Sequence, residues 1–364
     1  MTALHRLRRF VGRVRAIGAL AVVVLASTAL ALAGGPPVGA AAAPTPSADS
    51  ADSSTLSSST LSSLTLSSST VSSPATAPQA TGRLLRDGTG LYPRVIRLEH
   101  NGAANGRVLA GVVSFVGEAD GIGAIYESTD DGATFTHVGT VADPEAARGQ
   151  GLCCATLFEL PRQIGTMPAG TLLWAASVGA SDRPMSLRIW KSQDLGRTWS
   201  YLSACATAPN TGGLWEPEFS VAGDGHLVCH YADETDPTHS QKLMRVRSSD
   251  GTTWVDRVPT VASPTFGHRP GMPVVRALPN GEYVMTYEVC GLGGQYDCVV
   301  HIRRSPDGWS WGTSSWIGSR PETVDGKYFT HTPTIAWGPS ASNGNGRLML
   351  IGQILQNRDG SVAA

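Results

Sequence analysis

The stretch that decides the fold is SQDLGRTW, residues 192–199. In such a segment Asp194 can accept hydrogen bonds from the backbone of a turn, and Gly196 can supply the positive φ that a tight hairpin requires. The aromatic side chain of Trp199 can then pack between neighbouring sheets. All three tasks are structural, so we interpret Asp194 as a turn residue and not as a catalytic carboxylate.

The same pattern occurs four times in the chain. Besides residues 192–199, it is present as STDDGATF (128–135), SSDGTTW (248–254) and SPDGWSW (305–311). The intervals between these copies are each long enough for one four-stranded unit, and a fixed repeat of this kind is typical of propellers. The copies resemble the Asp-box, the repeat of sialidase-like β-propellers.

Segments with strand composition flank the repeats and complete a pattern of three strands, a repeat and a fourth strand. The clearest are residues 170–177, 186–191, 281–288 and 299–304, and residues 332–337 and 347–353 begin another unit after the fourth repeat. We therefore predict an all-β fold, a sialidase-like β-propeller of four-stranded antiparallel blades. Six blades are expected, and the repeats fall short of six, so we expect the C-terminal part of the ring to be incomplete.

The chain divides into three parts. Residues 1–43 carry several arginines, an apolar run and small residues, which predicts a secretory signal peptide; a membrane anchor, the alternative, would need a longer apolar run. Residues 44–81 are a Ser/Thr-rich tract that predicts a disordered linker. Residues 82–364 form the predicted propeller domain. We expect the protein to be secreted, extracellular and free of the membrane after cleavage.

The composition excludes some partners. The formal charge is −1, from 28 basic and 29 acidic residues, so nothing favours binding to nucleic acid. Charged residues make up only 16%, with 42 Gly and 23 Pro, which suits turn-rich β structure. We expect a monomer.

Two glutamates stand out, because an isolated buried carboxylate is expensive unless it is paired or used in chemistry. Glu216 begins a strand in LWEPEFSV, and Glu288 ends one in VMTYE. Inner strands of a propeller converge on its centre, so these carboxylates can face each other across a sugar as acid and base. Glu218 would share a strand face with Glu216 if the strand were regular, and Pro217 makes that regularity uncertain.

Four segments, in this order between the repeats, resemble glycoside hydrolase family 93: YPRVIRL, LWEPEFSV, HLVCHYADETDPTHSQKL and HRPGMPVVRALPNGEYVMTYE. The resemblance implies a six-bladed propeller that cleaves 1,5-linked α-L-arabinan of plant cell walls from one end, releasing arabinobiose with inversion. The catalytic glutamates of the family carry over onto Glu216 and Glu288. We expect Glu288 to be the acid and Glu216 the base.

Other residues at the ends of inner strands are candidates for substrate binding, and a structural ion pair or core hydrogen bond is the alternative for each. Arginines can hold sugar hydroxyls or tune a carboxylate, and an aromatic ring can stack on a sugar. The candidates are Arg94, Trp215, Tyr231, Asp233, Arg269, Tyr287 and His331.

The six cysteines of an exported chain favour disulfides. Cys290 and Cys298 would close a short loop, and a bond from Cys153 or Cys154 to Cys205 is an alternative that the sequence leaves open. The spacings match no zinc pattern, so we expect neither a metal nor a cofactor.

Two rival functions have to be distinguished from an arabinanase. A sialidase shares the repeats but uses a Tyr nucleophile and an arginine triad, for which only Arg94 and Arg269 are candidates. A non-catalytic propeller that binds glycans would instead have Glu216 and Glu288 far apart or in ion pairs.

Overall fold

The computed structural model describes residues 84–115, 121–147, 151–179, 183–340 and 343–363. From Leu85 onward they belong to one compact unit. The predicted signal peptide and Ser/Thr-rich linker lie outside the described residues. Within these ranges, no helix has both the length and the apolar character needed to cross a membrane. The helices there are single 3-10 turns: η1 (Gly102–Ala104), η2 (Pro144–Ala146) and η3 (Gly294–Tyr296).

Antiparallel sheets make up the unit, and the strands of the first three sheets pair in chain order. Blade 1 contains β1 (Leu91–Arg97), β2 (Val108–Ser114), β3 (Ile122–Ser128) and β4 (Thr136–Val141). Blade 2 contains β5 (Leu152–Glu159), β6 (Leu172–Val178), β7 (Ser186–Ser192) and β8 (Ser200–Thr207). Blade 3 contains β9 (Leu214–Val221), β10 (Leu227–Asp233), β11 (Lys242–Ser248) and β12 (Val255–Val261).

The later sheets depart from this pattern. Blade 4 contains β13 (Arg269–Ala277), β14 (Tyr283–Cys290), β15 (Val299–Ser305), β16 (Tyr328–Thr330) and β19 (Ile354–Gln356). A two-stranded sheet follows, formed by β17 (Thr334–Ser340) and β18 (Asn343–Ile351).

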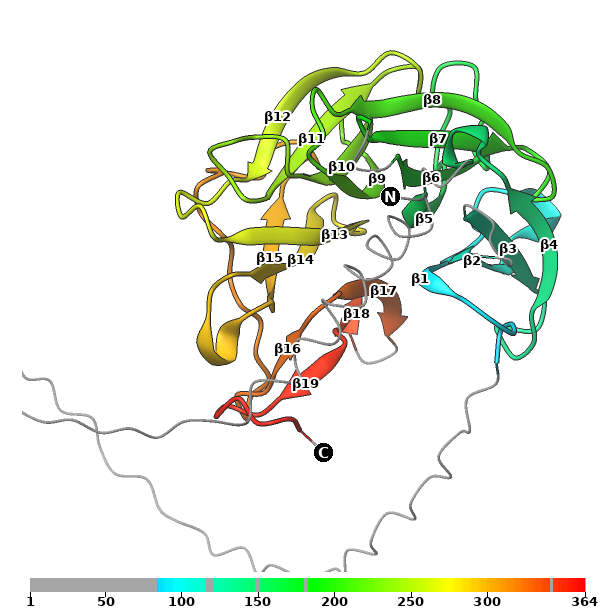
Figure 1. The fold of residues 1–364 in the computed structure, drawn as a ribbon. Helices are drawn as coiled ribbons and strands as arrows, with labels where there is room; N and C mark the ends of the chain where they lie inside the picture. The colour runs from blue at the N-terminus through cyan, green and yellow to red at the C-terminus, as the bar shows by residue number, and fades with distance from the viewer. Residues whose placement is uncertain (1–83, 116–120, 148–150, 180–182, 341–342, 364) are drawn as a thin grey trace, which may run out of the picture. The chain divides into compact units, whose positions relative to one another are not determined.

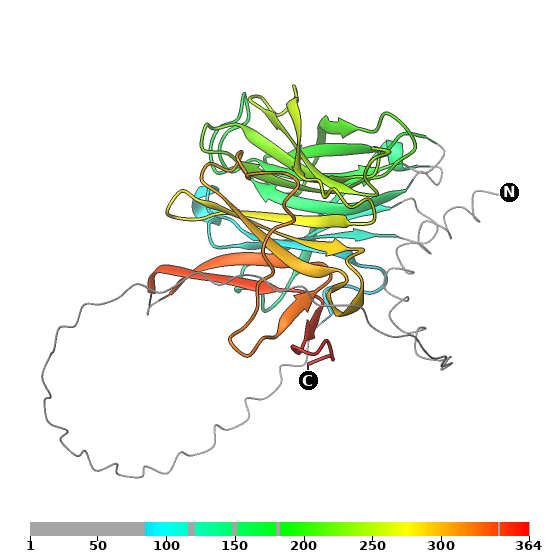
Figure 2. The ribbon, with the colours of Figure 1, turned by 90° about the vertical axis from the view of Figure 1, so that its left-hand side faces the viewer.

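The sheets are arranged around a common centre, as in a propeller (Figure 1). Strands β1, β5, β9 and β13 are innermost, and Figure 2 shows strands of neighbouring blades stacked as successive layers. The predicted all-β propeller of antiparallel blades is therefore confirmed. Of the six blades expected, the described residues form four and the two-stranded sheet.

The four repeats form the turns between the third strand of a blade and the segment that follows it. In the second copy, Asp194 accepts the N–H of Thr198 at 2.9 Å and its hydroxyl at 2.6 Å. Ser192 donates its hydroxyl to Asp194 at 2.7 Å and accepts the N–H of Gly196 at 2.9 Å. Corresponding bonds are made by Asp130, Asp250 and Asp307. These carboxylates bind their own turns, as the sequence predicts.

Each innermost strand of blades 1 to 4 carries the same β-bulge, in which two of its residues oppose one residue of the second strand. In β9, Trp215 pairs with Ala232 and Glu218 pairs with His230, so Glu216 and Pro217 are the bulged residues. The first bulged residue has a positive φ in all four blades: Tyr92 (48°), Cys154 (60°), Glu216 (54°) and Met272 (57°). A bulge bends its strand and redirects side chains.

Hydrophobic clusters fill the spaces between blades. One joins blades 1 and 2, one joins blades 2 and 3, and one joins blades 3 and 4. Trp199, Trp254 and Trp311, the aromatic residues of three repeats, pack against these clusters in that order. Each of these repeats thus forms a hairpin turn and also packs its aromatic side chain between two adjacent blades.

Blade 4 also has a strand after its repeat, but this strand, β16, does not follow the repeat directly as β4, β8 and β12 do in the other blades. Between Trp311 and β16 the chain forms an isolated bridge between Ser319 and Ile302. Gly312 and Gly318 have positive φ in this segment, which interrupts an extended strand.

Three disulfides are formed. Cys290–Cys298 is the predicted short loop. Cys205–Cys229 joins β8 of blade 2 to β10 of blade 3, and Cys153 is bonded to its neighbour Cys154 at the bulge of β5. The alternative bond to Cys205 therefore does not form.

We expect Asp194→Ala to lower the free energy of unfolding by about 1–3 kcal/mol, because it leaves turn donors without their acceptor. Denaturant unfolding followed by tryptophan fluorescence measures the effect. Asp87→Ala, at an exposed position outside the repeats, is the control and should change stability by less than about 0.5 kcal/mol. Equal effects in the two variants would contradict the structural role of the repeat.

Candidate active site

Glu216 lies at the bulge of β9, where the positive φ turns its carboxylate toward the neighbouring blade. Its Oε2 accepts the backbone N–H of Met272, the bulged residue of β13, at 2.9 Å. Burial raises the pKa of Glu216 to about 7, against this hydrogen bond, which lowers it. Glu288 and Glu234 add to the rise, and Arg94 opposes it.

Gly271 makes room for the amide of Gln241 beside this carboxylate. A Cβ at residue 271 would lie 3.5 Å from Oε2 of Glu216 and 2.5 Å from Nε2 of Gln241. The second distance is shorter than a tolerated contact, so a larger residue would push the Gln241 amide out of the site.

Glu288 lies near the end of β14, opposite Gly271. Its Oε2 accepts the backbone N–H of Thr332 at 2.7 Å, and its Oε1 is 3.6 Å from Sγ of Cys290. Burial raises the pKa of Glu288 to about 7 as well, with Asp297 adding to the rise and Arg269 opposing it. Only 8% of Glu288 is exposed.

The two carboxylates therefore have matching environments. Each accepts one backbone N–H, from Met272 of β13 for Glu216 and from Thr332 just before β17 for Glu288, and Glu288 is near enough to raise the pKa of Glu216 by charge repulsion. In the part of the chain that the structure describes, neither glutamate forms an ion pair. When two neighbouring carboxylates have pKa values near neutrality, one can be protonated while the other is ionised, which is the state that acid and base catalysis requires.

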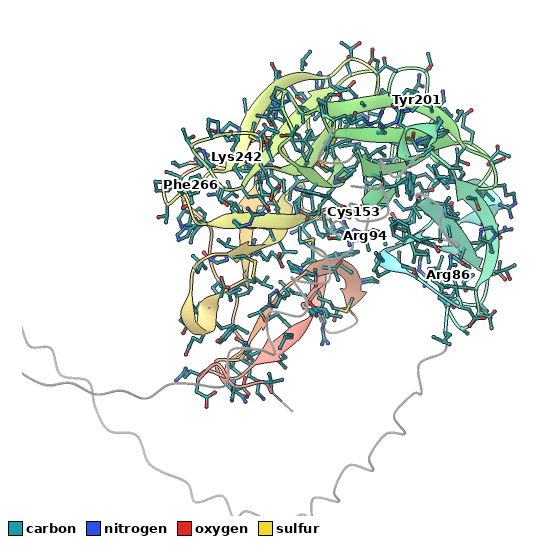
Figure 3. The ribbon with its side chains drawn as sticks, in the orientation of Figure 1. Arg86, Arg94, Cys153, Tyr201, Lys242 and Phe266 are labelled. Atoms are coloured by element: carbon teal, nitrogen blue, oxygen red, sulfur yellow. A yellow bond between two sulfur atoms is a disulfide. The ribbon has the colours of Figure 1, made fainter. Side chains whose placement is uncertain are left out.

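Tyr92 completes the centre from blade 1. Burial and the charges of Glu216 and Glu288 raise the pKa of its hydroxyl, which Arg94 partly offsets, so the phenol stays protonated. Arg94 follows two residues later on β1 and is drawn near the middle of the ring (Figure 3), near enough to Glu216 to lower the pKa of that carboxyl. Arg94 and Tyr92 therefore lie on the same inner strand beside the glutamates.

Arg269 and Trp215 also lie beside the glutamates, and both contact Glu234. The indole N–H of Trp215 donates to Oε2 of Glu234 at 2.9 Å, and Arg269 forms an ion pair with Oε1 of the same carboxylate. Both side chains remain partly exposed, so a bound molecule can still reach them.

Tyr231 and Tyr287 are placed in the core. Both are fully buried, Tyr231 in the cluster between blades 2 and 3 and Tyr287 in the cluster between blades 3 and 4. The hydroxyl of Tyr287 donates to the carbonyl of Ile317 at 2.6 Å. These positions favour packing, the structural alternative, over contact with a ligand.

Asp233 is also committed elsewhere. Glu288 pairs with Gly271, the residue just before the bulge of β13. In blade 3 the corresponding residue is Ala232, which pairs with Trp215 just before the bulge of β9. Asp233 is therefore one position away from the one that matches Glu288. It forms an ion pair with Arg257 at 2.8 Å and accepts the N–H of Thr235.

His331 lies at the start of the two-stranded sheet with a φ of 61°. Its ring and the sulfurs of Cys290 and Cys298 come within 4.8 Å of one another, near enough to hold a metal ion. The two sulfurs are bonded to each other, so neither is a thiolate ligand. Burial lowers the pKa of His331.

Glu218, two residues after Glu216, has a different environment. It accepts the hydroxyl of Thr156 at 2.9 Å and pairs with Arg276 at 2.8 Å, so it connects β5, β9 and β13. The bulge therefore gives the two glutamates of β9 different surroundings: Glu216 lies in the centre of the site, and Glu218 lies between blades.

Four residues of the site were not predicted from the sequence: Tyr92, Glu234, Gln241 and Met272. The signal for the bulges was present, because Tyr92, Glu216 and Met272 each precede a proline in an inner strand, as Thr332 does before β17. Nothing in the local sequence marks Glu234 or Gln241, since their roles depend on the loop between β10 and β11.

No model of a protein family matches the chain, and no curated protein matches it. Among solved structures, the α-L-arabinanase of Penicillium chrysogenum in complex with arabinobiose is 31% identical; the match covers 73% of this chain and 76% of that one, with a TM-score of 0.64. The family 93 α-L-arabinofuranosidase of Fusarium graminearum, also with arabinobiose, is 27% identical over 76% and 80% of the chains, with a TM-score of 0.62. An N-acetylgalactosamine deacetylase from F. plautii, 15% identical with a TM-score of 0.51, is similar in fold alone.

We expect Glu218→Ala to lower the free energy of unfolding by about 1–3 kcal/mol, because it leaves Arg276 and Thr156 without their acceptor. Chemical denaturation measures this. The comparison is Glu216→Gln, which keeps the shape of a side chain outside any described ion pair and should cost less. A Glu218→Ala protein as stable as the unaltered chain would contradict a structural role for this carboxylate.

Proposed function

The chain belongs to glycoside hydrolase family 93, and from this premise we propose that it is a secreted enzyme that cleaves 1,5-linked α-L-arabinan from one end, releasing arabinobiose with inversion. The observation that carries the proposal is the pair formed by half-buried Glu216 and buried Glu288, which accept backbone N–H groups and whose pKa values are both raised to about 7. Arabinobiose is bound by the similar enzymes from Penicillium chrysogenum and Fusarium graminearum.

The proposed reaction uses the two glutamates in different protonation states. The protonated one donates to the glycosidic oxygen of the leaving sugar, while the ionised one takes a proton from a water molecule that attacks the anomeric carbon from the opposite face. After the reaction, the base releases its proton to solvent and the acid takes one up, which restores both glutamates to their starting states. The protonated hydroxyl of Tyr92 and the guanidinium of Arg94 are placed to hold sugar hydroxyls between them.

The charges around the pair are balanced. Glu216 and Glu288 repel each other equally, and each faces one further carboxylate and one guanidinium: Glu234 and Arg94 for Glu216, and Asp297 and Arg269 for Glu288. We therefore keep the expectation from the sequence, with Glu288 as the acid and Glu216 as the base.

The sialidase alternative has less support. Tyr92 lies near two glutamates, as a tyrosine nucleophile would, but its pKa is raised and the hydroxyl therefore stays protonated. Arg269 is also occupied by Glu234, which leaves it poorly placed to join Arg94 in binding a carboxylate. A binding propeller is disfavoured because neither glutamate is paired with a cation in the described residues.

We expect Glu216→Gln and Glu288→Gln each to reduce hydrolysis of linear arabinan by at least about a hundredfold, since each removes a proton transfer from the reaction. Chromatography of the released sugars measures this, with a sialoside incubated in parallel. Arabinobiose as the first product of the unaltered enzyme supports the proposal, and sialic acid would overturn it. An aryl arabinobioside tests the assignment: its good leaving group needs no acid, so Glu288→Gln should retain activity on it and Glu216→Gln should not.

Both variants should remain folded. The folded protein favours the protonated form of both glutamates, because their pKa values are raised to about 7. Each glutamate therefore contributes most to stability below the ordinary carboxyl pKa, and this contribution is lost as the pH rises through about 7. At pH 8 the glutamine variants should therefore melt no lower than the unaltered protein, and a lower melting temperature would mean that lost activity reports lost structure.

We expect kcat/KM for arabinan to be greatest near pH 7 and to fall on both sides. Below this pH the base becomes protonated, and above it the acid loses its proton, because burial raises both pKa values to about 7. The two limbs belong to the coupled pair rather than to single residues. Initial rates at substrate concentrations below KM give the profile, and an optimum near the ordinary carboxyl pKa would contradict a pair held near neutrality.

A further inference from the structure

We propose that Glu234 is a positioning residue of this site: one carboxylate oxygen orients the indole of Trp215 beside Glu216, and the other pairs with Arg269. The inference rests on the proposed function, because the sugar ring expected to stack on Trp215 is that of arabinan. Glu234 directly follows β10, and its side chain is 25% exposed at the rim of the site.

The two oxygens of Glu234 serve different partners. Oε2 accepts the indole N–H of Trp215 at 2.9 Å, and Oε1 accepts Nη2 of Arg269. The hydrogen bond to the polar edge of Trp215 acts together with the packing of its ring against the clusters between blades 2 and 3 and between blades 3 and 4, and both favour one orientation of the indole face. The carboxylate of Glu234 thus contacts both the indole of Trp215 and the guanidinium of Arg269.

The backbone around Glu234 is built for this contact. The N–H of Glu234 donates to the carbonyl of Gly213 at 2.9 Å. A Cβ at Gly213 would lie 2.0 Å from the indole nitrogen of Trp215 and 2.6 Å from Oε2 of Glu234. Only a glycine leaves space for the bond between these two side chains.

Arg269 is held from its other side as well. It donates to Ser240 Oγ at 2.8 Å and to Gln241 Oε1 at 2.6 Å, while the Gln241 amide donates to the carbonyl of Pro270 at 3.0 Å. Arg269 therefore stays in place when Glu234 is changed, and the loss falls mainly on Trp215.

The charge of Glu234 acts on Glu216 in addition to its hydrogen bonds. The groups that face Glu216 are Glu234 from the β10–β11 loop, Glu288 from β14, Arg94 and Tyr92 from β1, and the N–H of Met272 from β13. Glu234 is one of two anions in this set. Its charge and its hydrogen bonds can be separated, because glutamine keeps an acceptor oxygen and removes the charge.

The test compares Glu234→Ala, Glu234→Gln and Gly213→Ala, with Glu282→Gln as a control that removes the same charge from an exposed position in the turn before β14. Kinetics on arabinan give KM, kcat and the pH profile. Hydrogen exchange of the Trp215 indole N–H by NMR, with its signal assigned from Trp215→Phe, reports the contact without any need for activity.

We expect Glu234→Ala and Gly213→Ala to raise KM about tenfold with kcat less affected, as for loss of one hydrogen bond to a charged group, and to speed indole exchange. Glu234→Gln should restore KM and slow exchange, yet shift a limb of the kcat/KM profile to lower pH, which Glu282→Gln should not do. Unchanged KM and exchange in Glu234→Ala would overturn the proposal. Unaltered protein inactive on arabinan would overturn the proposed function alone, because indole exchange still decides the role of Glu234.

Discussion

The site depends on one backbone constraint, the bulge with a positive φ at the same position of every innermost strand in blades 1 to 4. In β9 the bulge inserts Glu216 and Pro217 opposite a single residue of β10. Non-glycine residues at positive φ carry a conformational cost of order 1 kcal/mol or more, and such strain persists where the surrounding structure enforces it. Here the enforcing structure is the ring, since the N–H of one bulge binds the carboxylate of another, from Met272 to Glu216.

The same constraint explains why this centre can hold two acids. A carboxylate in an apolar interior normally acquires a cation, and the chain supplies cations close by in Arg94 and Arg269. Arg269 is occupied by Glu234, Gln241 and Ser240, so it moderates Glu288 without pairing with it. Each glutamate is left with one backbone donor and with the other as a like-charged neighbour, and burial then holds both pKa values near neutrality.

Much of this could be predicted from sequence. The repeats identify the blades because each contains the donors and the acceptor of its own turn within eight residues. The two glutamates stand out because carboxylates are uncommon in segments with the composition of buried strands. Asp233 was misplaced by one position because a strand's register depends on its bulges, and those are set by backbone geometry that composition hardly records. Glu234 was missed because its partners, Trp215 and Arg269, come from two different blades. The irregular segment after Trp311 was missed because the repeat predicts a turn but not the strand that follows it.

Glu216 and Glu218 show that a single bulge can give two nearby glutamates different surroundings. They are the same residue type on one strand, two positions apart, and a regular strand would give them one face and one environment. The bulge instead gives Glu218 an arginine and a threonine hydroxyl, so that it connects three blades. Glu216 receives one N–H and two anionic neighbours, so its ionised form destabilises the fold as the pH rises through about 7. This difference in surroundings, rather than any difference in residue type, is why the proposed chemistry is assigned to Glu216 and not to Glu218.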